Sequence, residues 1–184
     1  TFIEDAIVLN RDYLVKDNLQ RRKEFFFAGE LKLSKINELD LEIIKLLKND
    51  AKKPLLDIAD ELKIDFRTAR SRIKNLENNQ IIQGYTIFLN LSILGFQLHK
   101  LCIKLKNYDL DKLQELADYC KKNPHVVHII KSLGSWELEL EIEENNLNNI
   151  YNFIRTIKSE HSKIIKQINL VTITDELKLE FFPE

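Results

Sequence analysis

The chain has 184 residues, 44% of them hydrophobic and 31% charged, and its formal net charge at pH 7 is −1. This composition suffices for one or two globular domains, and the near-zero charge excludes a protein that is basic throughout, although it leaves room for a local basic patch. No apolar run approaches the roughly 18 residues of a membrane helix, the start lacks the layout of a signal peptide, and the two cysteines form no disulfide framework, so we expect a cytoplasmic protein without a membrane partner.

The N-terminal stretch contains two apolar runs, AIVL (6–9) and EFFFAGEL (24–31), and each of them predicts a strand. Two interpretations of this stretch stay open. In the first, it is an arm that packs on the rest of the chain through its three phenylalanines. In the second, it is the remnant of a preceding module, because residues 169–184 repeat its order of apolar strand, charged stretch and Phe pair.

Residues 35–83 carry the periodicity of three short helices. Apolar stripes are formed by Leu39, Ile43, Leu46 and Leu47 in the first helix and by Leu55, Ile58, Ala59 and Leu62 in the second. Pro54 suits a first helical position, and Asp65 is a good N-cap for the third helix. Three short helices with a tight turn before the last one match a helix-turn-helix, so we predict a DNA-binding domain.

The third predicted helix, FRTARSRIKNLE (66–77), has a buried line and a basic face. At 100° per residue, Ile73 and Leu76 stay within about 40° of Ala69, and the long basic side chains point away from this line. Residues 63–83 contain five basic side chains against two acidic ones. An ordinary solvated helix face is the alternative, but the two preceding helices and the small residues of this helix favour a recognition helix for double-stranded DNA.

Individual contacts follow from this helical wheel. We predict base contacts from Arg67, Ser71 and Lys74, with Thr68 and Arg70 at the edge of the surface, and phosphate contacts from Lys52, Lys53 and Arg72. Arg72 lies nearer the buried edge, so either a phosphate or an acidic side chain of a neighbouring helix is its expected partner.

The later part of the chain has strand-like periodicity interrupted by two helical stretches. We expect strands at 99–106, 125–133, 136–143 and 164–174 and helices at 109–122 and 145–161. The order βαββαβ predicts a ferredoxin-like domain with two helices on one face of the sheet, and an α+β fold for the whole chain. The expected segments are an N-terminal arm (1–34), a helix-turn-helix domain (35–83), a hinge or linker strand (84–96) and a ferredoxin-like domain (97–184).

Charges alternate along two strands that neighbour each other in the usual order of this fold. They are Lys100, Lys104 and Lys106 on the first strand and Glu137, Glu139, Glu141 and Glu143 on the third. We predict that these side chains form cross-strand ion pairs rather than a metal or substrate site.

The sequence resembles the Lrp/AsnC (feast/famine) family of prokaryotic transcription regulators. The matching segments are LDLEIIKLL (39–47), LLDIADEL (55–62), TARSRIKNLE (68–77), IIQGYTIFLN (81–90), LSILGF (91–96) and LGSWELELEI (133–142). The resemblance implies a DNA-binding unit followed by a ferredoxin-like module called RAM, which in the family forms dimers and higher assemblies. The additional arm and the EFFP ending resemble archaeal members with extra domains.

The resemblance also implies a small-molecule effector, because many members bind an amino acid or a related compound near the interface between dimers. By position, the effector site would be bordered by Gly134, Ser135, Trp136, Glu137 and Leu138.

An enzyme is the main competing class, because siroheme decarboxylases share the two-part architecture. His125 and His128 lie an odd number of residues apart, so they face opposite sides of one strand. Cys102 and Cys120 fit small core residues better than nucleophiles. We therefore predict a DNA-binding regulator that forms a homodimer or a higher oligomer, with no catalytic residue, metal or cofactor. The alternatives are a ligand-sensing assembly module that does not bind DNA, and a siroheme-decarboxylase-like enzyme.

Overall fold

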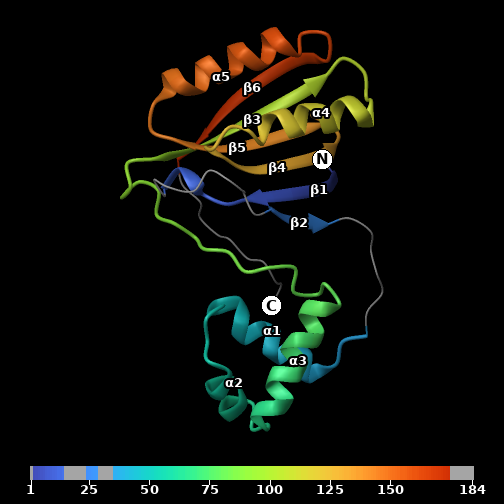
Figure 1. Cartoon of the computed structure of the whole chain (residues 1–184), viewed down its shortest axis with the longest axis vertical. Helices are drawn as coiled ribbons and strands as arrows, with labels where there is room; N and C mark the ends of the chain where they lie inside the picture. The colour runs from blue at the N-terminus through green and yellow to red at the C-terminus, as the bar shows by residue number, and fades with distance from the viewer. Residues whose placement is uncertain (1, 15–23, 29–34, 175–184) are drawn as a thin grey trace. The chain divides into compact units, whose positions relative to one another are not determined.

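The computed structural model describes residues 2–14, 24–28 and 35–174 (Figure 1). These residues form two compact units. Among the described residues, one unit comprises 35–87 and contains three helices, and the other combines 2–14 and 24–28 with 88–174.

The helical unit consists of α1 (Glu38–Asn49), α2 (Leu55–Glu61) and α3 (Phe66–Asn78). Asn37 begins α1 with a capping box, in which its side chain and that of Asp40 each accept a hydrogen bond from the other's backbone N–H. Pro54 lies at the N-cap of α2, one residue before the helical position predicted for it. A proline is tolerated at either position because it has no N–H to leave unpaired.

The apolar stripes meet in a single small core. Its buried members are Ile43, Leu47, Ile58, Ala59, Ala69 and Leu76, with Leu39, Leu46, Leu62 and Ile73 packed around them. The predicted stripes are thereby confirmed except at Leu55, which is half-buried and lies outside this cluster.

The second unit is built on one antiparallel sheet with the strand order β2-β1-β4-β5-β3-β6. Its strands are β1 (Phe2–Leu9), β2 (Glu24–Ala28), β3 (Gln97–Leu105), β4 (Val126–Leu133), β5 (Leu138–Glu144) and β6 (Ile165–Ile173), and its helices are α4 (Leu110–Cys120) and α5 (Leu147–Glu160). The last four strands and the two helices follow the predicted βαββαβ order, which confirms the ferredoxin-like fold. Both helices cover the same face of the sheet, where they share one apolar core (Figure 1).

The N-terminal strands extend this sheet beyond β4. β1 pairs antiparallel with β4, β2 pairs antiparallel with β1, and a short 3-10 helix, η1 (Asp12–Leu14), follows β1. Ile7 and Leu9 belong to the apolar core of the sheet. The predicted packing of the three phenylalanines concerns side chains that lie outside the described part of the structure. The remnant hypothesis depends on residues 175–184, which also lie outside it.

The linker between the units differs from the predicted strand. Residues 83–90 form neither helix nor strand, and turns follow at 91–95, where Gly95 has a φ of +76°. Strand pairing among the described residues involves no part of 83–90, so this apolar segment has no neighbour with which to complete a ladder. The side chains of Tyr85, Ile87 and Phe88 are exposed.

Candidate nucleic-acid interface

Helix α3 has the buried line that its sequence predicts. The side chain of Asp65 caps the helix by accepting a hydrogen bond from the backbone N–H of Arg67 (2.7 Å). Ala69 and Leu76 are buried, and Ile73 packs against the same core. These contacts fix the rotation of α3 about its axis, so its opposite face is turned to solvent.

This solvent-facing side carries the predicted base-contacting residues. All five of them are exposed: Arg67, Thr68, Arg70, Ser71 and Lys74. Within the described residues, no ion pair engages Arg67, Arg70 or Lys74. The three cations are therefore exposed and have no ion-pair partner in the part of the chain that the structure describes. We call these five residues the basic face of α3.

The residues predicted to contact phosphates differ from one another. Lys52 is exposed in the turn between α1 and α2. Its neighbour Lys53 forms an ion pair with Glu61 of α2. The guanidinium of Arg72 lies 3.4 Å from the carboxylate of Asp40 on α1, which is the acidic side chain of a neighbouring helix that the sequence left as one of two alternatives.

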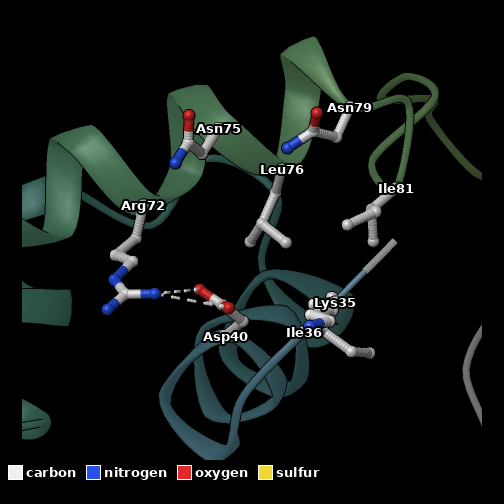
Figure 2. A pocket seen from close by; sticks show the side chains of 8 residues that line it. All are labelled: Lys35, Ile36, Asp40, Arg72, Asn75, Leu76, Asn79 and Ile81. Atoms are coloured by element: carbon white, nitrogen blue, oxygen red, sulfur yellow. Dashed lines mark hydrogen bonds and ion pairs between the residues drawn. The ribbon is translucent and has the colours of Figure 1, made fainter. Parts of the chain in front are cut away.

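A hollow of about 70 Å³ lies beside the Arg72–Asp40 pair, which forms part of its lining (Figure 2). It is lined by Lys35, Ile36, Asp40, Arg72, Asn75, Leu76, Asn79 and Ile81. Small-molecule sites usually enclose about 300–1,000 Å³, so this hollow has room for ordered water rather than for an organic ligand. Asp40 is 6% exposed and joins the start of α1 to α3, a role that the sequence alone did not indicate.

The turn between β4 and β5 contains the predicted effector residues. Gly134 and Ser135 are exposed at its tip, and Gly134 has a φ of +144°, which favours glycine. Trp136 is half-buried, and its carbonyl accepts a hydrogen bond from Ser132 Oγ (3.1 Å). This end of the turn therefore presents glycine, a hydroxyl and part of an indole to solvent.

The two remaining effector candidates are committed to the fold. The carboxylate of Glu137 accepts one hydrogen bond from the backbone N–H of Leu105 (2.7 Å) and one from Lys104 Nζ (2.6 Å). Leu138 is fully buried in the apolar core. Their backbones border the turn, but both carboxylate oxygens of Glu137 already have partners within the chain.

The predicted cross-strand ion pairs lie on the face of the sheet that α4 and α5 do not cover. Lys100 Nζ lies 3.1 Å from Glu139 and 3.2 Å from Glu141, and Lys104 pairs with Glu137 (2.6 Å). We call these five residues the charged sheet face. Burial by itself raises the pKa of Glu141, but the hydrogen bond from His128 and the charges of His128 and Lys100 outweigh it, so the pKa lies below its ordinary value.

Two members of the predicted set have other partners. Lys106 Nζ donates to the backbone carbonyl of Ser162 (2.8 Å). Glu143 binds Arg11 and Tyr13, which lie more than 100 residues earlier in the chain, and no local pattern could have indicated these contacts.

The cysteines and histidines have structural contacts. Cys102 and Cys120 are buried free thiols. Cys120 belongs to the apolar core of the sheet, as predicted, whereas Cys102 is buried outside that cluster. Burial raises the pKa of Cys120 to about 12, which keeps it protonated and unreactive. Nδ1 of His125 lies 2.8 Å from the backbone carbonyl of Glu143. In the described part of the chain, no group of three or more His, Cys, Asp or Glu side chains is arranged to hold a metal ion. No helix there is long and apolar enough to cross a membrane.

Comparison with known proteins supports the helix-turn-helix assignment. The model of the AsnC-type helix-turn-helix domain matches residues 36–77. The HTH-type transcriptional regulator LrpA of Pyrococcus horikoshii is 36% identical over 101 residues, which are 54% of this chain and 69% of LrpA. The HTH-type transcriptional regulator FL11 of the same organism is 28% identical over 124 residues, which are 67% of this chain and 81% of FL11.

The fold has a solved counterpart in the transcriptional regulator NMB0573 of Neisseria meningitidis, whose structure is a complex with L-Met. The TM-score is 0.70 at 15% identity, and the match covers 81% of this chain and 97% of NMB0573. This chain is therefore longer than that regulator, and the helix-turn-helix match begins only after β2. The identity to LrpA over two thirds of its length, together with the helix-turn-helix match, shows that the chain belongs to the Lrp/AsnC family of transcription regulators.

Proposed function

We propose that this protein binds double-stranded DNA in a sequence-specific manner and regulates transcription, with α3 as its recognition helix. The observation that carries the proposal is the basic face of α3, whose three cations have no ion-pair partner among the described residues although other lysines and arginines of the same unit do. An exposed helix with long basic and short polar side chains fits the major groove, where arginine and lysine bind guanine edges. A regulator of this kind acts in the cytoplasm.

The proposed contacts divide by position. Arg67, Ser71 and Lys74 read bases, and Thr68 and Arg70 lie at the edge of the groove. Lys52 contacts a phosphate directly. Lys53 and Arg72 add positive potential near the backbone while they remain paired with Glu61 and Asp40.

We further propose that two copies act as a homodimer, which doubles the contact with DNA. The exposed, unpaired segment around Tyr85, Ile87 and Phe88 supports this assembly, because apolar side chains and free backbone groups of an extended segment are the features that pair with a second chain. Two recognition helices related by a dimer axis would read half-sites about one helical turn apart, or a multiple of that distance.

The turn at Gly134, Ser135 and Trp136 is proposed as the place where a small effector such as an amino acid binds, with the backbones of Glu137 and Leu138 at its border. The complex of NMB0573 with L-Met supports this class of ligand. Thermal unfolding in the presence of each amino acid is the test, because a ligand that binds only the folded state raises the midpoint. Trp136→Ala should abolish the shift, and the absence of any shift in the wild-type protein would reject the effector.

Selection of bound duplexes from random DNA tests the central proposal. The wild-type protein should enrich one palindromic site, and Arg70→Ala combined with Lys74→Ala should weaken its binding by about 100-fold, since each contact is worth roughly 1–3 kcal/mol. Lys158→Ala, which removes an exposed charge from α5 of the sheet unit, is the control and should bind normally. A selection that enriches no sequence would favour an assembly module that senses a ligand without binding DNA.

A further inference from the structure

The helix-turn-helix unit is inserted into the sheet unit rather than appended to it. The chain leaves the sheet at the end of β2, builds α1, α2 and α3, and returns to the sheet at the start of β3. Within residues 2–174, two chain segments therefore join the units: residues 29–37 and residues 79–96. A unit that was simply fused to the N-terminus of the sheet would have only the second of these connections.

The first connection, residues 29–37, can restrain the helix-turn-helix unit only if the hairpin of β1 and β2 is firmly held by the sheet. β1 pairs with β4 over most of its length, and β2 pairs with β1. Ile7 and Leu9 are 2% and 1% exposed in the core beneath α4 and α5. Lys131 of β4 adds an ion pair with Asp5 (3.2 Å). The hairpin is thus part of the sheet and not a loose extension.

A buried ion pair fixes the end of β1. Arg11 donates to Glu143 of β5 through Nε (2.8 and 3.0 Å) and through Nη2 (2.8 Å), and the side chain of Glu143 is only 2% exposed. The hydroxyl of Tyr13 donates to the same carboxylate. Burial and this carboxylate raise the pKa of Tyr13, so the phenol stays a donor. Such a bidentate, water-shielded contact is among the strongest that a side chain makes.

The second connection ends at the same place. The ring of Tyr13 stacks on His125 (4.7 Å between centroids) and contacts Phe96, the last residue before β3, at 5.1 Å. The end of the linker and the 3-10 helix after β1 are therefore held together on the sheet by one aromatic cluster.

We infer that the hairpin is a second tether, which restricts the orientations of the helix-turn-helix unit and thereby sets which half-site spacings the dimer accepts. A segment fixed at both ends has fewer conformations than one fixed at a single end, and the geometry of a linker decides which pairs of sites two linked modules can occupy together. The consequence for DNA rests on the proposed function, whereas the restriction of motion does not.

Cutting the first connection tests this inference with almost no change in composition. A protease recognition sequence is inserted within residues 29–34, and the full-length protein is compared before and after cleavage. Gel filtration and intact mass should show that the fragment with β1 and β2 stays bound. Dissociation of the fragment would contradict the anchoring on which the tether depends.

The cut and uncut proteins are then titrated with duplexes whose half-sites are separated in one-base-pair steps. The uncut protein should bind a narrow range of spacings. Cleavage should raise the affinity for spacings outside this range by about tenfold relative to the preferred one, because the freed unit reaches more orientations. An uncut variant with a long Gly/Ser insertion at the same place should behave like the cut protein. An unchanged spacing profile in both would overturn the inference.

A measurement without DNA separates this inference from the proposed function. Amide ¹⁵N relaxation of α1, α2 and α3 should show faster motion relative to the sheet after cleavage, while relaxation within the sheet stays the same. Equal relaxation before and after cleavage would overturn the tether whether or not DNA is bound. A protein that binds no half-site pair but shows the relaxation change would refute only the proposed function.

Discussion

Charged residues crowd two regions of this molecule, the basic face of α3 and the charged sheet face, and their surroundings differ. On the sheet, Lys100 Nζ lies 3.1 Å from the carboxylate of Glu139 and 3.2 Å from that of Glu141, so each of these three charges is paired with an opposite charge. On α3, the neighbours of Arg67, Arg70 and Lys74 supply no such partner among the described residues. A run of charges therefore indicates a binding surface only when the fold leaves it without counter-charges, and a run of alternating charges on adjacent strands is better explained as part of the sheet.

The largest expected effect comes from a buried carboxylate of the sheet outside the charged sheet face, Glu143, which pairs with Arg11. Glu143→Ala should lower the free energy of unfolding by about 3–5 kcal/mol, because it leaves the guanidinium of Arg11 in a shielded site without its partner. Urea denaturation measures the loss. Glu42→Ala, which breaks an exposed pair with Lys45 on α1, is the control and should cost no more than about 0.5 kcal/mol. Equal losses in the two variants would show that burial does not distinguish these charges.

The basic face should show the opposite behaviour. Arg67→Ala should weaken specific DNA binding by about 1–3 kcal/mol and relax discrimination at one base position, because an exposed arginine without a partner contributes to binding and not to folding. Its thermal stability should stay within about 0.5 kcal/mol of the wild type. A variant that lost stability instead of DNA affinity would contradict this prediction, because Arg67 would then stabilise the fold as the sheet charges do.

Asp40 shares a feature with each of the two regions. It is buried like the carboxylates of the sheet, and it pairs with Arg72 of α3. Asp40→Ala removes half of the capping box and the partner of Arg72, so the helical unit should lose about 1–2 kcal/mol of stability. Hydrogen exchange should show the loss in α1 and α3 and not in the sheet. Arg72→Ala should reproduce only the share of this stability loss that comes from the ion pair, because it leaves the capping box intact.

The smallest expected effect concerns the pH dependence of the charged sheet face. Because the pKa of Glu141 is lower in the folded state than in the unfolded chain, its ionised form stabilises the fold above its ordinary pKa, and this contribution is lost as the pH falls through the lowered value. Glu141→Gln should therefore flatten the acid limb of the stability profile and cost about 1 kcal/mol or less at neutral pH. An unchanged acid limb would exclude this carboxylate as a source of the pH dependence.

Short-range patterns were sufficient for much of the fold. The buried line of α3 follows from helical periodicity, and the pairing of Lys100 with two glutamates follows from strand order once the ferredoxin-like fold is recognised. The strand expected in the linker does not form in a single chain, because strand formation needs a neighbouring strand and periodicity does not supply one.

Contacts between residues distant in the sequence could not be predicted. Arg11 and Glu143 are separated by 132 positions, and nothing in either local sequence indicates that β1 joins the edge of β4. The partner of Arg72 was open for the same reason, because the helical wheel gives the direction of a side chain but not the element that it meets. Which charges stay available to an external partner is thus decided by tertiary structure.

The dependence of DNA affinity on salt concentration tests the role of the basic face most directly. On the selected site, the logarithm of the binding constant should fall steeply and linearly with the logarithm of salt concentration. Because Lys74 is assigned to bases and Arg70 to the edge of the groove, the double alanine variant should bind more weakly, and its slope should be smaller by at most about one, for a phosphate beside Arg70. An unchanged affinity and slope in the double variant would contradict the account, because the unpaired cations of α3 would then take no part in binding.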